Sequence, residues 1–258
     1  MLNLREAAQK NMPPVPNIPA LNDAAIATWK ARMVNEYGSS RVFEGLYKQL
    51  VQLDIAPSDL ERLRSFADDE RRHGVLCASV VEALGGEAIA PSLPVVPFPE
   101  HPDVSPLEGA IRNLISISCM SETVAVSLIG AERLEMPEGP LRTLLTRIYA
   151  DECAHANFGW RLLGDLLAKG DEEMKERLKP YIQLAFAHLE KHELAHLPVG
   201  VQPPPEGVQL GLCSGLDARE LFYATIEQII IPGLTSHGLD AQWAWDTRNE
   251  AQLVQKPA

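Results

Sequence analysis

The chain has 258 residues, of which 46% are hydrophobic and 22% charged, as is ordinary for a water-soluble globular protein. This length suffices for one sizeable helical domain with appendages or for two small domains. The net charge of −12 argues against non-specific binding to nucleic acid or to an anionic membrane, because both surfaces repel a net anion. Aromatic residues make up only 6%, and the abundance of helix-forming residues favours an all-α fold.

The four cysteines lie far apart and form no C-x-x-C pair, which excludes a zinc ribbon, a rubredoxin-type iron site and a thioredoxin-type motif. Cys77, Cys119 and Cys153 fall in predicted helices, where reduced and buried thiols are expected. The N-terminus lacks the apolar stretch of a signal peptide, and no run of 18 apolar residues occurs. These features predict a cytoplasmic protein without a membrane or nucleic-acid partner.

Residues 1–21 contain four closely spaced prolines and are predicted to form an extended N-terminal arm without a core of its own. Beyond the arm, apolar periodicity interrupted by Gly and Pro predicts four long helices. A proline-rich stretch over residues 89–106 follows the second helix and is not expected to be helical, because proline lacks the backbone donor. The predicted helices cover residues 22–53, 58–84, 107–134 and 139–169.

The lengths of the connections predict the topology. Short links join the first helix to the second and the third to the fourth, so each pair is expected to form an antiparallel hairpin. The proline-rich stretch is then the crossover of a ferritin-like four-helix bundle. Two further helices are predicted near residues 172–196 and 217–231. The expected domains are an arm over 1–21, the bundle over 22–170, additional helices packed on it over 171–240 and a C-terminal tail over 241–258.

Two copies of the motif D-E-x-x-H lie in the middle of the second and fourth predicted helices. They are Asp69-Glu70-Arg71-Arg72-His73 and Asp151-Glu152-Cys153-Ala154-His155. Residues at i and i+3 share a helix face, so the Glu and His of one copy can reach the same metal ion. Carboxylate and imidazole ligands suit iron or manganese better than ions that prefer thiolate. One copy would often arise by chance, but two copies at matching places indicate a metal site.

Helical-wheel positions, at about 100° per residue, place Glu70 and Glu152 in the middle of the apolar stripes of their helices. A carboxylate there is costly to bury unless it is paired or ligated, which is the main physical reason to expect bound cations. Asp69 and Asp151 precede the two histidines by four residues. They are expected to accept an imidazole N–H and fix its tautomer, the alternative being an exposed helix aspartate.

The first and third helices should each supply one further carboxylate. Glu122 lies within about 20° of the apolar stripe of the third helix. On the first helix Glu36 lies on the apolar face, whereas Glu44 points about 80° away from Glu36, so Glu36 is preferred. The alternative is that these common residue types lie on solvated helix faces. The predicted metal ligands are Glu36, Glu70, His73, Glu122, Glu152 and His155.

A competing motif, His192-Glu193-Leu194-Ala195-His196, matches the H-E-x-x-H signature of zinc proteases, and His188 lies one turn earlier. The motif ends a predicted helix next to Pro198, and no Glu or His follows nearby as a third ligand. The preferred interpretation is a histidine-rich helix C-terminus, which the helix dipole favours. The alternatives are a protease with Glu193 as general base and an adventitious surface metal site.

The segments NEYGSSRVF, DDERRH, SETVAVSL and DECAHANFGWRLL, within residues 22–169, resemble the ferritin-like di-iron carboxylate superfamily. They are most similar to bacterial ferritin-like domain proteins of uncharacterised function, rather than to storage ferritins or rubrerythrins. The resemblance implies two iron ions, or a manganese–iron pair, held by the six predicted ligands. The chain departs from rubrerythrins in lacking a rubredoxin-like cysteine cluster. It departs from N-oxygenases of this superfamily in having Ile148 where they carry an extra histidine.

By this resemblance the chain is expected to be a non-haem di-iron oxygenase or oxidase that uses O₂ or peroxide to oxidise a small organic substrate. An external electron donor is expected, since the sequence contains no flavin or nicotinamide motif. The alternatives are a ferroxidase or other iron-handling protein and a metal-stabilised module without enzymatic activity. The substrate, the electron donor and the oligomeric state, with a homodimer among the options, are left open.

Overall fold

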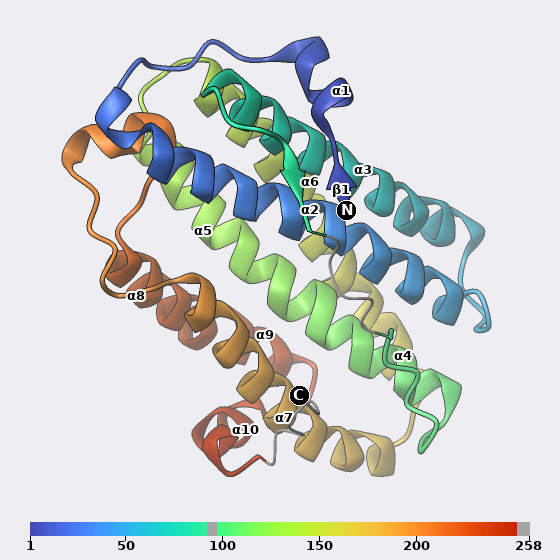
Figure 1. The fold of residues 1–258 in the computed structure, drawn as a ribbon. Coiled ribbons are helices and arrows are strands. Elements are labelled where there is room, and N and C mark those ends of the chain that lie inside the picture. The colour runs from blue at the N-terminus through green and yellow to red at the C-terminus, as the bar shows by residue number, and fades with distance from the viewer. Residues whose placement is uncertain (92–96, 252–258) are drawn as a thin grey trace. The chain divides into compact units, whose positions relative to one another are not determined.

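The computed structural model describes residues 1–91 and 97–251. These residues are mostly α-helical, and the strands β1 (Leu2–Asn3) and β2 (Ile89–Ala90) are two residues long, which confirms the all-α class (Figure 1). The chain divides into two compact units, each built from three segments. Unit 1 comprises Met1–Pro99, Ile129–Asp151 and Gln202–Ser214, and unit 2 comprises Glu100–Leu128, Glu152–Val201 and Gly215–Ala258. The predicted bundle segment, 22–170, contributes to both units.

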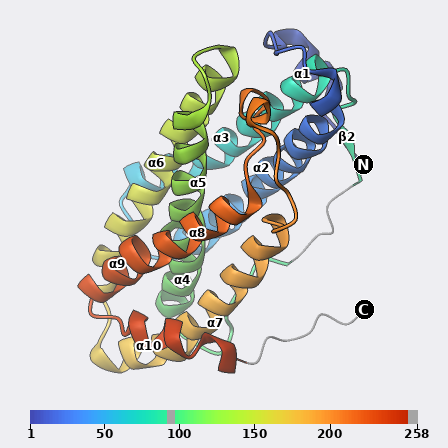
Figure 2. The same ribbon diagram turned by 90° about the vertical axis from the view of Figure 1, so that its left-hand side faces the viewer.

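Two long helices of unit 1, α2 (Asn22–Leu50) and α3 (Pro57–Ala83), pack along each other (Figures 1 and 2). A link of six residues reverses the chain between them, as the sequence predicts. The helix α3 begins at Pro57, one residue before the predicted start at residue 58. Proline is favoured in the first turn because an N–H there has no acceptor within the helix, so that its absence in proline costs no hydrogen bond.

The core of unit 1 joins α2 and α3 to the first part of α6 (Pro140–Leu167). Its largest member is Trp29, whose indole N–H donates a hydrogen bond of 2.8 Å to the carbonyl of Leu210, in the 3₁₀ segment η4 (Pro205–Leu210). The apolar stripe predicted around Glu70 is buried throughout. It consists of Leu63, Phe66, Cys77 and Val81.

The N-terminal segment differs from the expected extended arm without a core. Residues Leu2 and Asn3 pair in antiparallel register with Ala90 and Ile89, and a short helix, α1 (Arg5–Ala8), follows. Two 3₁₀ turns, η1 (Gln9–Asn11) and η2 (Pro19–Leu21), complete the segment. Leu4 and Ala8, one helical turn apart, are buried in the core of unit 1. Proline content alone therefore mispredicted a segment that is held by strand pairing and by this apolar pair.

The third predicted helix is continuous but changes type. It consists of α4 (Pro106–Leu114), the π-helical segment η3 (Ile115–Ser121) and α5 (Glu122–Glu135). The hydroxyl of Ser105 caps α4 by accepting the N–H of Glu108 at 3.2 Å. In unit 2, Gly159 of α6 lies against η3, and a Cβ placed on it would be 2.2 Å from Cβ of Ser118. The close approach of the two helices therefore requires glycine at position 159.

Both additional helices are present in unit 2. The first, α7 (Glu172–His196), has the predicted bounds, and the second begins as α8 (Gly215–Thr225). A π-helical segment, η5 (Ile226–Ile230), then leads into α9 (Ile231–Ser236). The predicted tail contains α10 (Ala241–Asp246), which packs against α7 (Figure 2), and the 3₁₀ turn η6 (Arg248–Glu250). Residues 92–96 of the predicted crossover and 252–258 of the predicted tail lie outside the described residues.

One helical stretch of the described chain, Pro106–Glu135, is long and apolar enough to cross a membrane by length and composition. Core helices of water-soluble proteins pass the same test, and 44% of its most apolar window is buried inside the protein.

The carboxylate of Glu82 ties the N-terminal segment to α3. It accepts hydrogen bonds from the N–H of Ala88 (2.7 Å), Nε2 of Gln9 (2.8 Å) and Nε of Arg5 (3.2 Å). Burial alone would raise the pKa of Glu82, but these donors outweigh it and lower the pKa below its usual value of 4.5. Ionised Glu82 therefore contributes stability that is present above the pKa of the unfolded state and is lost as the pH falls through the folded-state pKa.

We expect Glu82→Gln to lower the free energy of unfolding at pH 7 by about 1 kcal/mol, because a charge-assisted acceptor is lost. The difference from wild type should begin to shrink near pH 4.5, where the carboxyl is protonated in the unfolded state, and should vanish below the lowered folded-state pKa. Urea unfolding at several pH values measures both effects. The matched control is Glu87→Gln, since Glu87 is exposed and should change stability by less than about 0.5 kcal/mol. A constant difference across this pH range would contradict the role of the Glu82 charge.

Candidate metal centre

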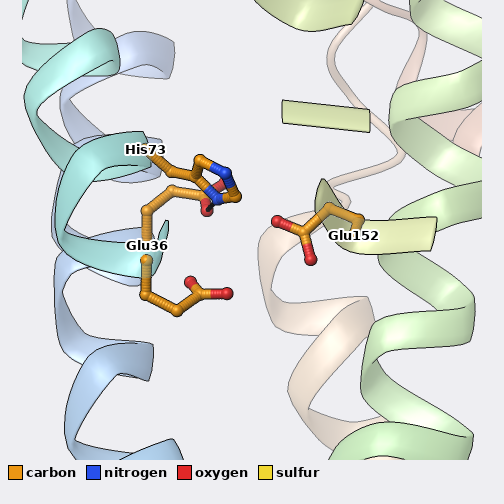
Figure 3. Close-up of side chains that lie close together, drawn as sticks. Glu36, His73 and Glu152 are labelled. Carbon is orange, nitrogen blue, oxygen red and sulfur yellow. Dashed lines mark ion pairs between the residues drawn. The ribbon is translucent and has the colours of Figure 1, made fainter. Parts of the chain in front are cut away.

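Three of the six predicted ligands come together in unit 1. Glu36 projects from α2, and Glu70 and His73 project from α3, with one ligand atom of each within 4.8 Å of the others. We call them the α2–α3 triad. The Nδ1 of His73 lies 3.4 Å from Oε2 of Glu36, and both side chains extend in the same direction from their helices (Figure 3). His73 is fully buried, and the exposed fraction is 2% for Glu70 and 17% for the Glu36 side chain.

The structure places Glu36, and not Glu44, beside Glu70 and His73. The Glu44 side chain is 43% exposed and forms an ion pair with Arg71, away from the triad. Beside the triad, Gly74 lies against Tyr37, where a Cβ would be 2.8 Å from Cβ of the tyrosine. Glycine at this position lets α2 and α3 approach closely where their ligands meet.

Asp151 contacts the histidine of the α2–α3 triad, as its predicted role requires. Oδ2 of Asp151 lies 3.0 Å from Nε2 of His73. An N–H on Nε2 directed at this carboxylate leaves Nδ1 as the acceptor nitrogen on the Glu36 side. Asp69 accepts a hydrogen bond from Arg72, and its expected contact with an imidazole remains a prediction.

Arg72 is a residue of the site that the sequence analysis did not assign. Its Nη2 donates to Asp69 at 2.6 Å and to Asp151 at 2.9 Å. Partial burial would lower the pKa of Arg72, but the hydrogen bonds to the two aspartates raise it above its usual value. The sequence indicates the pairing with Asp69, which lies three residues before Arg72 on the same helix. It does not indicate the pairing with Asp151, which is 79 residues away.

The other three predicted ligands come together in unit 2. Glu122 projects from α5, and Glu152 and His155 project from α6, again with one ligand atom of each within 4.8 Å of the others. We call them the α5–α6 triad. Nδ1 of His155 lies 3.4 Å from Oε2 of Glu122 and 3.3 Å from Oε2 of Glu152, the residue labelled on α6 in Figure 3. All three side chains are buried.

The π-helical segment η3 ends immediately before Glu122. Such wide turns are rare and are often found at functional sites. On the far side of Glu122, Thr123 accepts a hydrogen bond of 3.1 Å from the indole N–H of Trp160, which ties α5 to α6 within unit 2. Glu122 is therefore held between a non-standard helical turn and an interhelical hydrogen bond. Helical periodicity in the sequence gave no sign of the π-turn.

Each triad offers two carboxylates and one imidazole, so each can hold a metal ion. This donor set suits iron or manganese, and neither triad includes a thiol. Burial raises the pKa of the Cys119 thiol above its usual range, which keeps it protonated and unsuited to ligation. Cys77 is buried as predicted, whereas Cys153 is only half-buried because it lies beside the inward face of α6 that carries Glu152.

The competing protease motif has a different environment. His188, His192 and His196 are exposed on α7, whose last residue is His196. Among the described residues, no group of three or more closely spaced metal-ligand side chains includes them. The protease alternative therefore lacks a third ligand in the structure as it does in the sequence.

The sequence matches no model of a known protein family, and no curated protein matches it. The geometry of the two triads therefore carries the functional argument.

Two buried carboxylates of unit 2 allow a charge test of the metal-free protein. Glu152 shares its site with the carboxylate of Glu122, so a second negative charge lies nearby. Glu108 is equally buried but accepts hydrogen bonds of 2.9 Å from each of Arg112 and Arg177. Neutralising a carboxylate beside another anion should relieve repulsion, whereas neutralising one between two cations should remove attraction.

We expect metal-free Glu152→Gln at pH 8 to unfold at the same or a higher denaturant concentration than the wild type. Glu108→Gln should lose about 1–3 kcal/mol. Chemical unfolding in the presence of a chelator measures both. A loss for Glu152→Gln as large as that for Glu108→Gln would show that Glu152 is a structural ion-pair residue rather than a ligand awaiting a cation.

Proposed function

We propose that the two triads together form one dinuclear metal centre in a ferritin-like four-helix bundle, and that this centre binds two iron ions or a manganese–iron pair. The observation that carries the proposal is the repetition of one donor arrangement. In each triad an E-x-x-H helix supplies a carboxylate and an imidazole, a second helix supplies another carboxylate, and the Nδ1 of the histidine lies 3.3–3.4 Å from carboxylate oxygen.

The chain itself links the two triads. Asp151, which contacts His73 of the α2–α3 triad, is directly followed on α6 by Glu152 of the α5–α6 triad. A single helical turn thus serves both groups of ligands. This continuity favours one centre with two ions over two unrelated mononuclear sites.

The charges support two divalent ions. The two triads contain four carboxylates, Glu36, Glu70, Glu122 and Glu152, and two divalent cations would offset their four negative charges. The imidazoles are neutral when they ligate a metal. Without cations, charge on these largely buried groups would be costly, since burial penalises ionised carboxylates. The donor set therefore fits the proposed metals in charge as well as in ligand type.

We further propose that the protein is an oxidoreductase. When bound and reduced, the iron pair would supply O₂- or peroxide-dependent oxidation of a small organic substrate. The residues of the chain have more limited tasks. Asp151 orients His73, Arg72 holds Asp151 in place, and the apolar side chains of Phe66 and Leu63 exclude water beside Glu70. The electrons come from a separate donor, and the protein acts in the cytoplasm in this proposal.

Anaerobic loading with Fe(II), followed by removal of excess iron, should leave about two iron ions per chain. Glu70→Ala and Glu36→Ala should each lose most of this iron, because each removes a buried ligand. Glu44→Ala is the matched control, since Glu44 lies on the same helix as Glu36 but is exposed and paired with Arg71. Iron analysis of the purified proteins measures the outcome. Unchanged stoichiometry in Glu70→Ala would refute the ligand assignment.

Exposure of the reduced, iron-loaded protein to O₂ should consume O₂, as recorded with an oxygen electrode. Glu44→Ala should consume it at the wild-type rate, whereas Glu36→Ala should be inactive. Sustained consumption with an added reductant and a small organic compound, together with formation of an oxidised product, supports the oxidoreductase. Consumption that depends only on repeated addition of Fe(II) would instead indicate iron handling. An iron-loaded protein that does not react with O₂ would contradict both activities.

A further inference from the structure

The proposed iron centre leaves unused the histidines near the C-terminal end of α7. Two of them, His188 and His192, are four residues apart and therefore share one face of the helix. Both side chains line the same pocket, which lies within unit 2 between α7 and the π-helical segment η3. Its volume is about 160 Å³, and its other lining residues are Ser116, Met120, Ser121, Ala185 and Leu189.

The pocket distinguishes this pair from the sequence motif that includes His196. The rings of His192 and His196 are close, with centroids 4.6 Å apart. However, Nδ1 of His196 lies 2.8 Å from the carbonyl oxygen of His192, and His196 does not line the pocket. Glu193, the base that a zinc protease would require, does not line it either. The pair that faces a common space is His188 and His192.

The groups around the pocket suit a metal that prefers imidazole. Nitrogen donors come from the two histidines, and no carboxylate lines the pocket. The Ser116 hydroxyl lies 2.6 Å from the hydroxyl of Tyr181, and the Ser121 hydroxyl donates to the carbonyl of Ser116 at 3.1 Å. Hydroxyls already engaged in this way are poor primary ligands but can hydrogen-bond metal-bound water. Since one water occupies about 30 Å³ of liquid, the pocket has room for an ion and several waters.

The protonation state of both histidines favours ligation. Partial desolvation and the charge of Lys191 lower the pKa of His188, and partial desolvation and His196 lower the pKa of His192. Both imidazoles are therefore neutral at neutral pH, which is the form that binds a metal.

We propose that His188 and His192 bind a divalent transition-metal ion of the imidazole-preferring class, Zn²⁺, Cu²⁺ or Ni²⁺, with water completing its coordination in this pocket. The absence of a lining carboxylate argues against Mg²⁺ and Ca²⁺, which require oxygen ligands. The site is separate from the two triads and does not depend on the proposed iron chemistry.

The test uses Ni²⁺ as the probe and the full chain as the protein. Isothermal titration calorimetry at pH 7.5 should detect one Ni²⁺ ion bound by the wild type. His188→Ala and His192→Ala should each bind this ion at least about tenfold more weakly, because loss of a residue that merely supports a metal ligand already costs about that much affinity. His196→Ala is the matched control, because it removes an exposed histidine from the same helix without altering the pocket lining. Far-UV circular dichroism checks that all three variants keep their helices.

The proposal would be overturned if Ni²⁺ binding were unchanged in both His188→Ala and His192→Ala, or if the wild type bound no Ni²⁺ ion that either substitution weakens. A loss in His196→Ala equal to that in His192→Ala would also overturn it, because the ion would then lie on the 192–196 pair outside the pocket. Ni²⁺ bound at the triads does not confuse the result, since it would be the same in wild type and all three histidine variants.

Discussion

The cost of burying charge governs the arrangement of this protein. Glu70, Glu122 and Glu152 occupy positions on helices whose neighbouring residues are apolar and buried. Ordinary packing would place leucine or isoleucine there at no electrostatic cost. Elsewhere in the chain, buried carboxylates follow a simpler rule: Glu108 and Glu132 are held by arginines at hydrogen-bond distance. The triads instead place carboxylates next to one another and next to an imidazole. A bound metal cation would stabilise this arrangement.

Close helix packing brings the side chains of each triad near one another. At Gly74 the absence of a side chain lets α2 and α3 approach beside the α2–α3 triad, and at Gly159 it lets α6 approach η3 in unit 2. Metal–ligand bonds are short, so ligands from two helices can share an ion only where the backbones are near each other. Hydrogen bonds from Arg72 and Trp160 then fix neighbouring side chains. The scaffold thereby positions the candidate ligand side chains, which would reduce the cost of ordering them around a metal ion.

Much of the fold could be predicted from residue patterns, and the failures have identifiable causes. Helix positions and the burial of Glu70 and Glu152 follow from apolar periodicity, which local sequence carries directly. The helical wheel also predicted Glu36 to be less exposed than Glu44, as the structure has it, because exposure on one helix follows the same periodicity. The π-helical segment before Glu122 was missed, since its wider turns depart from the 100° spacing on which helical periodicity relies.

Contacts between distant segments account for the other errors. The N-terminal segment is ordered by pairing of residues 2–3 with 89–90 and by the carboxylate of Glu82, neither of which proline content reveals. Arg72 acquires its role from an aspartate 79 residues away. The pocket beside His188 likewise combines η3 and α7, which α5 and α6 separate in the sequence. Local patterns specify which face of a helix is buried, but they do not specify which distant segments pack against that face.

The adjacency of Asp151 and Glu152 has a mechanical consequence. Their Cα atoms are separated by one trans peptide, about 3.8 Å, a distance that neither thermal motion nor mutation elsewhere changes. One residue engages His73 and the other engages His155. Any rotation or translation of this turn of α6 therefore moves both carboxylates together, the one that contacts His73 and the one that contacts His155. The link between the two contacts is thus a single covalent connection, not a chain of packed side chains.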